Sequence, residues 1–293
     1  MSEFDLPLAL LRGLHVAAMI SGAGALLFRV AVMRGATLGA CTSIARANLS
    51  LAFVTGVVWL VVATQSIAGA SGLADTFAAL PPVMRDTRFG MLLTARLALL
   101  LIAVATAAWD GRRLAVPLGA SFAALMLQPF LGHAAAANDW ALAATETLHL
   151  TAAAAWLGGL PPLLLLVSRA PARLGIAMAR RFSPIALASV LVLAGTALVQ
   201  AAALIGSVAG LTGTAYGEAD LTKTALFAVL LVCAALNRFV FAGSLGDRRP
   251  EEARRRLRTS LRIEIALGLA VVLAAGVLAS LPPAGEAMHM QPQ

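Results

Sequence analysis

The sequence predicts an all-α fold, a polytopic membrane bundle of about eight transmembrane helices that forms a single domain over residues 1–293. Three observations support this class. Hydrophobic residues make up 60% of the chain and charged residues only 12%. The apolar residues form blocks of about twenty, which is the length of α-helix that crosses a bilayer. The polar breaks between the blocks are short, so no soluble domain is left over.

The spans follow from the apolar blocks in order. Glu3 and Asp5 precede the first block, where a signal peptide would carry basic residues, so we expect a retained helix. The break at 70–88 is expected to lie on the membrane surface as a short amphipathic turn. Residues 283–293 form a short tail. The predicted spans are 8–30, 46–69, 89–109, 114–133, 142–167, 184–206, 222–242 and 260–281.

Basic residues are concentrated in alternate breaks, which is the asymmetry expected of cytoplasmic loops. The remaining breaks and the two ends hold only Arg85, Arg88 and Lys223, so both termini are predicted to face away from the cytoplasm. The net charge of +8 therefore reflects topology and not a nucleic-acid partner. The predicted cytoplasmic set is Arg29, Arg34, Arg46, Arg112, Arg113, Arg169, Arg173, Arg180, Arg181, Arg238, Arg248, Arg249, Arg254, Arg255, Arg256, Arg258 and Arg262.

Catalytic motifs are not found in the sequence. It shows no Ser-His-Asp or zinc-protease spacing near either predicted membrane surface, so an enzyme is not expected. Cys41 falls in a predicted inner loop and Cys233 within a span, so a disulfide between them is not expected.

All four histidines are predicted to lie toward the outer side of the membrane. His133 ends the fourth span and His289 is in the tail. His15 and His149 lie about eight or nine residues inside the first and fifth spans, which at about 1.5 Å per residue places both about 12–14 Å below the same surface. Two imidazoles at matching depth predict a shared pocket for one ligand.

Methionines are concentrated on the same side. Met19 follows one histidine by four residues and Met126 precedes another by seven, so each shares a helical face with an imidazole. Met288 and Met290 flank the histidine of the tail. Thioethers combined with imidazoles favour copper, particularly Cu(I), over magnesium or calcium.

An ionisable pair is predicted inside the hydrocarbon region. Glu146 precedes His149 by three residues, so both side chains project from one helical face. Such a pair is costly in a membrane and is by default a functional site, in which the carboxylate binds metal or orients the imidazole. The competing interpretation is structural: Glu146 neutralises Arg12 or Arg96, and His149 only hydrogen-bonds to a neighbouring helix.

Several motifs occur in a characteristic order. The fifth span reads Leu148-His149-Leu150, then Ala152 to Ala155, then Trp156-Leu157-Gly158-Gly159-Leu160, after a run of Gly132-His133-Ala134-Ala135, and further stretches lie at 182–184, 190–196, 213–217 and 235–239. Over about 130–282 this order resembles the CopD family of bacterial inner-membrane copper resistance and copper homeostasis proteins. The resemblance implies an eight-helix, multi-pass inner-membrane protein that moves copper from periplasm to cytoplasm, with a periplasmic copper chaperone as donor.

Three functions are compatible with these residues. The first is copper uptake or delivery, with Cu(I) or Cu(II) captured on the periplasmic side and passed to the buried residues. The second is electron transfer through a b-type haem that has His15 and His149 as axial ligands. The third is a structural or assembly protein whose polar residues only join helices. For the first function, the expected metal ligands are His15, Met19, Met126, His133, Glu146, His149, Met288, His289 and Met290.

Overall fold

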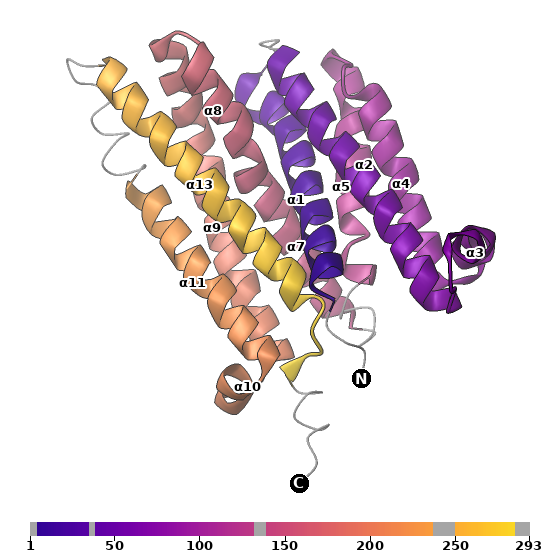
Figure 1. Ribbon diagram of the computed structural model, residues 1–293. Helices are drawn as coiled ribbons and strands as arrows, with labels where there is room; N and C mark the ends of the chain where they lie inside the picture. Colours follow the sequence, from indigo (N-terminus) through magenta and orange to yellow (C-terminus); the bar gives the residue numbers. More distant parts are fainter. Residues whose placement is uncertain (1–4, 35–38, 132–138, 237–249, 285–293) are drawn as a thin grey trace.

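The protein is a bundle of eight membrane-length helices, seen in a computed structural model that describes residues 5–34, 39–131, 139–236 and 250–284. Figure 1 shows the long helices side by side, with the start of α1 and the finish of α13 at the same end of the bundle. We call this the terminal end. Within the described residues there are helices and turns and no strand. The predicted all-α fold with eight spans is confirmed.

The helices run alternately up and down the bundle, as the arginine pattern predicts. α5 forms a span together with short flanking turns, and α7 and α8 form one span joined by the turn Leu157–Gly159. The elements are α1 (Leu6–Phe28, extended by a π-turn at Arg29–Met33), α2 (Gly39–Ala68), α3 (Leu73–Asp86), α4 (Arg88–Thr106), α5 (Ala115–Met126), α7 (Trp140–Trp156), α8 (Leu160–Arg169), α9 (Ala172–Leu204), α10 (Val208–Gly213), α11 (Ala215–Leu236) and α13 (Pro250–Leu278).

Several helices are longer than their apolar blocks. α2, α9 and α13 begin at Gly39, Ala172 and Pro250 instead of the predicted 46, 184 and 260, and α11 begins at Ala215 instead of 222. Hydropathy marks the part of a helix within the hydrocarbon, whereas backbone hydrogen bonding continues into the polar layer. The predicted end of the seventh span at 242 lies outside the described residues.

Side-chain caps fix where helices begin at the terminal end. Asp5 accepts a hydrogen bond from the Leu8 amide at 3.0 Å, and Asp139 accepts from the amides that open α7. The Thr87 hydroxyl accepts from the Gly90 amide at the start of α4. Each cap satisfies an amide that has no partner within its own helix.

Arginines stabilise helix ends on the opposite side of the bundle. Arg254 donates hydrogen bonds to the carbonyls of Val167 and Ser168, at 2.7 and 2.6 Å, in the last turn of α8. Arg29 donates to the Ala107 carbonyl after α4 and forms an ion pair with Asp110 at 2.5 Å. Cations are favourable at helix C-termini because unpaired carbonyls concentrate negative charge there.

α1 is the central helix of the bundle and contacts α2, α5, α7 and α13. It can approach so many neighbours because glycines replace side chains at the contacts. A Cβ at Gly24 would lie 2.1 Å from the Ala154 carbonyl oxygen and 2.5 Å from the Gly158 Cα, and Gly13 meets Gly276 in a similar way on α13. In lipid such small residues allow tight backbone packing.

The break after the second span forms a helix rather than the predicted short turn. α3 has 14 residues and includes both Pro81 and Pro82. Leu73 is 70% and Phe77 56% exposed, while Thr76 and Val83 face the protein. Figure 1 shows α3 projecting sideways from the terminal end beside α2 and α4. An amphipathic helix in this position fits the predicted location on the membrane surface.

The α1–α7 contact generates a stability prediction. We expect Gly24→Ala to lower the free energy of unfolding by about 1–3 kcal/mol, because the added methyl overlaps backbone atoms. Gly195→Ala, in α9, has no atom within 4 Å of the new methyl and is expected to be neutral or to stabilise by up to about 1 kcal/mol. Thermal denaturation of both variants in detergent checks this, and equal stability of the two would contradict the packing account.

Candidate functional site

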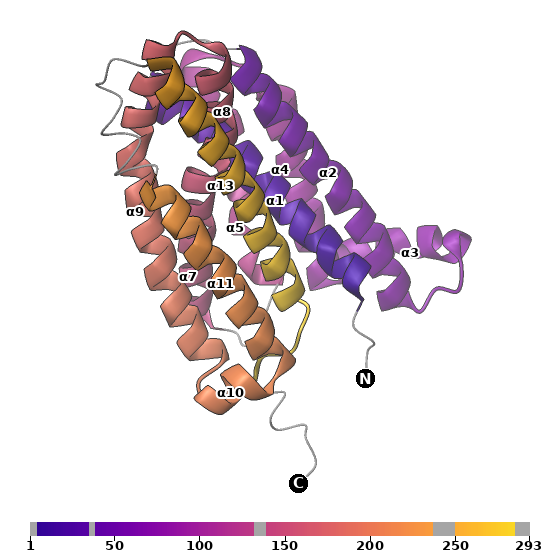
Figure 2. The ribbon, with the colours of Figure 1, turned by 60° about the vertical axis from the view of Figure 1, so that its left-hand side comes forward.

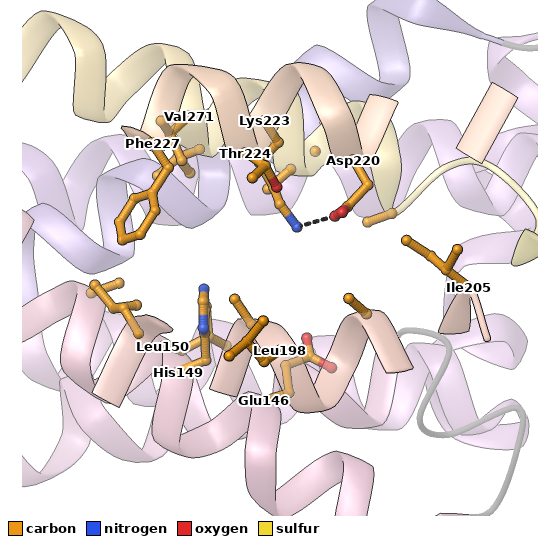
Figure 3. Close-up of a pocket in the computed structure, with 18 of the residues that line it drawn as sticks. Glu146, His149, Leu150, Leu198, Ile205, Asp220, Lys223, Thr224, Phe227 and Val271 are labelled. Atoms are coloured by element: carbon orange, nitrogen blue, oxygen red, sulfur yellow. Dashed lines mark ion pairs between the residues drawn. The ribbon is translucent and has the colours of Figure 1, made fainter. Parts of the chain in front are cut away.

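A cavity of about 780 Å³ lies among α1, α7, α9, α11 and α13. Its wall is mostly apolar, with leucine, valine, alanine and isoleucine side chains contributed by all five helices. Figure 3 shows α11 along one side of the space and the His149 and Glu146 side chains along the other. The polar or charged residues that line it are Arg12, Gln128, Glu146, His149, Ser207, Asp220, Lys223 and Thr224.

Glu146 and His149 line this cavity together, as their spacing predicts. They lie one helical turn apart on α7, about 9 and 13 Å along the helix from its start at Trp140. Both are therefore within the hydrocarbon region. A carboxylate and an imidazole that share one cavity at this depth could bind a cation between them.

Hydrogen bonding assigns the tautomer of His149. Its Nδ1 is 2.8 Å from the Thr196 hydroxyl oxygen, and that hydroxyl donates its own proton to the Val192 carbonyl at 2.7 Å. With the hydroxyl proton on the Val192 carbonyl, the threonine oxygen accepts from Nδ1, so this hydrogen-bond network assigns the proton to Nδ1. Nε2 is left unprotonated with its lone pair available in the cavity. This is the arrangement of a metal-ligating histidine whose other nitrogen is held by a second group.

His15 occupies a different environment and does not line the cavity. Its Nδ1 donates to the Ala52 carbonyl of α2 at 2.8 Å, and Arg96 donates toward Nε2 from 3.4 Å. The ring also packs edge-on against Trp59. Both nitrogens are thus engaged, and the predicted shared pocket with His149 differs from the structure. His15 and His149 lie at similar depths, but their side chains point in different directions around the axes of their helices. The structure therefore does not support axial ligation of one haem by these two histidines.

Arg96 is fully buried near the middle of α4. Its guanidinium donates to the Gln128 side-chain oxygen at 2.8 Å, while Nε and its other terminal nitrogen have no hydrogen-bond partner within the part of the chain that the structure describes. The guanidinium also interacts electrostatically with Glu146, without a direct ion pair. The structural interpretation of Glu146 as a counter-charge for Arg96 stays a prediction, and it is compatible with a role in the cavity.

α11 contributes polar groups that the sequence reasoning did not assign to a site. Lys223 and Asp220 form an ion pair at 2.6 Å on the cavity wall, and Thr224 lies beside them. The available signal was a charged pair three residues apart at the start of an otherwise apolar span. Gln128 lies inside the predicted fourth span as a single neutral polar residue, and it was not singled out.

The two predicted methionine ligands that the structure describes do not line the cavity. Met19 is fully buried in the hydrophobic core, and Met126 is 43% exposed at the end of α5. His133, Met288, His289 and Met290 lie outside the described residues. Among the residues that the structure describes, no group of three or more His, Cys, Asp or Glu side chains could hold a metal ion.

The fold and the cavity define the class: a polytopic α-helical membrane protein with a polar site buried between its helices. Two family descriptions match the chain. Residues 1–142 match the N-terminal domain of copper resistance protein D-like proteins, and residues 176–278 match copper resistance protein D. The chain belongs to this copper resistance protein family, as the resemblance at the fifth span predicts.

A curated relative is similar over part of its length. The copper transport protein CutJ of Bacillus subtilis (strain 168) is 37% identical over 175 residues, which cover 58% of this chain and 31% of CutJ. The chain thus spans about a third of the length of this relative. No solved structure matches the chain.

The Arg96–Glu146 interaction predicts a coupling energy. In a double-mutant cycle with Arg96→Met and Glu146→Gln, we expect the two changes to be non-additive by about 0.5–3 kcal/mol, because each single change leaves the other charge buried. The exposed pair Arg256 and Glu252 is the control, with a coupling of about 0.5 kcal/mol or less. Denaturation of the purified variants measures both cycles, and additivity at the buried pair would show that the charges do not interact.

Proposed function

We propose that this protein is a copper homeostasis protein that takes copper ions into its membrane domain through the Glu146–His149 pair. One observation carries the proposal: the two side chains lie one turn apart on α7 in a common cavity, and the Nε2 lone pair of His149 is left available by the hydrogen bond to Thr196. An unprotonated imidazole and a carboxylate are suitable ligands for copper.

The comparisons support copper as the ion. The family is named for copper resistance, and the relative that shares 37% identity is named a copper transport protein. Import into the cytoplasm, the bacterial inner membrane as location and a periplasmic copper chaperone as donor are parts of this proposal. They are motivated by the arginine-rich loops opposite the terminal end, which orient that end toward the periplasm.

The small number of ligands suits transfer better than storage. Glu146 and His149 provide two donors, and a permanent copper site would normally have three or four. An ion that must move on has to bind strongly enough to enter and weakly enough to leave. We therefore propose a transient site, which an ion reaches from the terminal end. His133 and the Met288-His289-Met290 segment, predicted from the sequence to lie on the outer side, are candidate capture residues.

Copper accumulation in cells tests the proposal. We expect His149→Ala and Glu146→Gln each to reduce cell-associated copper to the level of cells without the protein, because each removes one of the two donors. Thr145→Ala is the matched control, since this hydroxyl on α7 bonds only to its own helix and does not line the cavity. Elemental analysis at equal expression measures the effect, and accumulation equal to that of the wild type in both variants would refute the proposal.

Thr196 is predicted to position the imidazole. Thr196→Val removes the acceptor for the Nδ1 proton and is expected to lower copper accumulation by about tenfold, within the range seen when the partner of a metal-ligating histidine is lost. Thr196→Ser keeps the hydroxyl and should restore accumulation. The same uptake measurement checks both, and an unaffected valine variant would mean that the hydrogen bond does not matter to the site.

A further inference from the structure

The cavity is much larger than a metal ion requires. Its volume of about 780 Å³ falls within the roughly 300–1,000 Å³ typical of sites for organic molecules. Below the polar groups its walls are formed by Leu150, Leu193, Phe227 and Val271, which give copper nothing to bind. The volume and the apolar lining of the cavity therefore indicate a second ligand besides the copper ion.

The cavity opens sideways toward lipid. Leu198 of α9 is 73% exposed and Leu221 of α11 is 43% exposed, yet both line the cavity. These two helices are consecutive spans joined through the short α10, but they scarcely touch, because α9 packs on α7 and α11 packs on α13. Figure 2 shows α9 and α11 as neighbouring long helices at the edge of the bundle. A lipid-soluble molecule can reach the cavity between α9 and α11 without crossing water.

α11 presents a stripe of groups suited to an oxygen-bearing ring. Asp220, Thr224 and Phe227 are spaced by four and three residues, so they share one face of the helix, and all three line the cavity. The Thr224 hydroxyl has no hydrogen-bond partner among the described residues, whereas Thr222 on the same helix bonds to the carbonyl four residues before it. Trp156 packs edge-on against Phe227 and holds that ring in place.

The charges of the cavity favour a neutral occupant. The two basic residues, Arg12 and Lys223, are matched by the two acidic residues, Asp220 and Glu146, so the lining carries no net formal charge. The polar groups reach His149, about 13 Å along α7 from its start. Carrying a phosphate head group to that depth would be costly, whereas an uncharged hydroxyl or carbonyl loses far less on leaving water.

We propose that this cavity binds an uncharged, lipid-soluble ring compound with carbonyl or hydroxyl oxygens, the chemistry of an isoprenoid quinone or quinol. Its ring lies against Phe227, and one of its oxygens accepts from the Thr224 hydroxyl. In the quinol form, a ring hydroxyl also donates to the unprotonated Nε2 of His149. Its tail leaves past Leu198 into the bilayer. Binding of this compound does not depend on the proposed copper function, because it needs no metal ion.

The test uses the purified full chain in detergent, free of copper, titrated with decylubiquinone by isothermal calorimetry. We expect saturable, stoichiometric binding. Ala197→Phe fills the cavity from α9 and is expected to weaken binding by about tenfold or more, which corresponds to about 1.4 kcal/mol. Val199→Phe is the matched control, since this side chain is 54% exposed and does not line the cavity.

A second variant keeps the test decisive if Ala197→Phe does not fold. Thr224→Val preserves shape and removes only the hydroxyl, so it should weaken decylubiquinone binding while leaving thermal stability unchanged. A parallel titration with short-chain phosphatidylethanolamine distinguishes a phospholipid occupant. Absence of saturable quinone binding, equal loss in Val199→Phe and Ala197→Phe, or displacement of the quinone by equimolar phosphatidylethanolamine would each overturn the proposal. Copper accumulation by the same variants is measured separately, so failure of one proposal is distinguishable from failure of the other.

Discussion

The burial of Arg96 is the constraint on which much of the bundle depends. A charge in the middle of a membrane helix must be surrounded by protein groups that can accept its hydrogen bonds or balance its charge. Gln128 and His15 meet the guanidinium directly, and Glu146 balances it at longer range. These residues come from α1, from the turn after α5 and from α7, so the groups around this one cation are contributed by three different spans.

This arrangement gives the two buried histidines different chemistry. His15 uses one nitrogen on a backbone carbonyl of α2 and the other on Arg96, so it belongs to the structural network. His149 uses one nitrogen on Thr196 and keeps the other for the cavity. Arg96 on α4 does not line the cavity, which lies on the side of the bundle that contains α9 and α11. Glu146, which interacts electrostatically with Arg96, lines the cavity itself.

The side of the bundle that contains α9 and α11 is also where the helices pack least closely. Glycines draw α1 against α7 and α13, while α9 and α11 stay apart from one another. The cavity between them combines a small polar region with a large apolar one. An ion would use only the first, through Glu146 and His149, and a lipid-soluble molecule would use both. Both proposed ligands use Nε2 of His149, so binding of copper and binding of the organic ligand would affect one another at this nitrogen.

The sequence by itself determined the number of helices, their order and the depth of each polar residue, because hydropathy and the 1.5 Å rise per residue act along a single axis. It also determined that Glu146 and His149 share a face, since they lie one turn apart on one helix. Only the tertiary structure decided the direction in which His15 points, the contribution of Asp220, Lys223 and Thr224 from α11, and the existence of the cavity. Those features depend on how each helix is rotated against its neighbours, and hydrophobicity specifies that rotation poorly when almost every face is apolar.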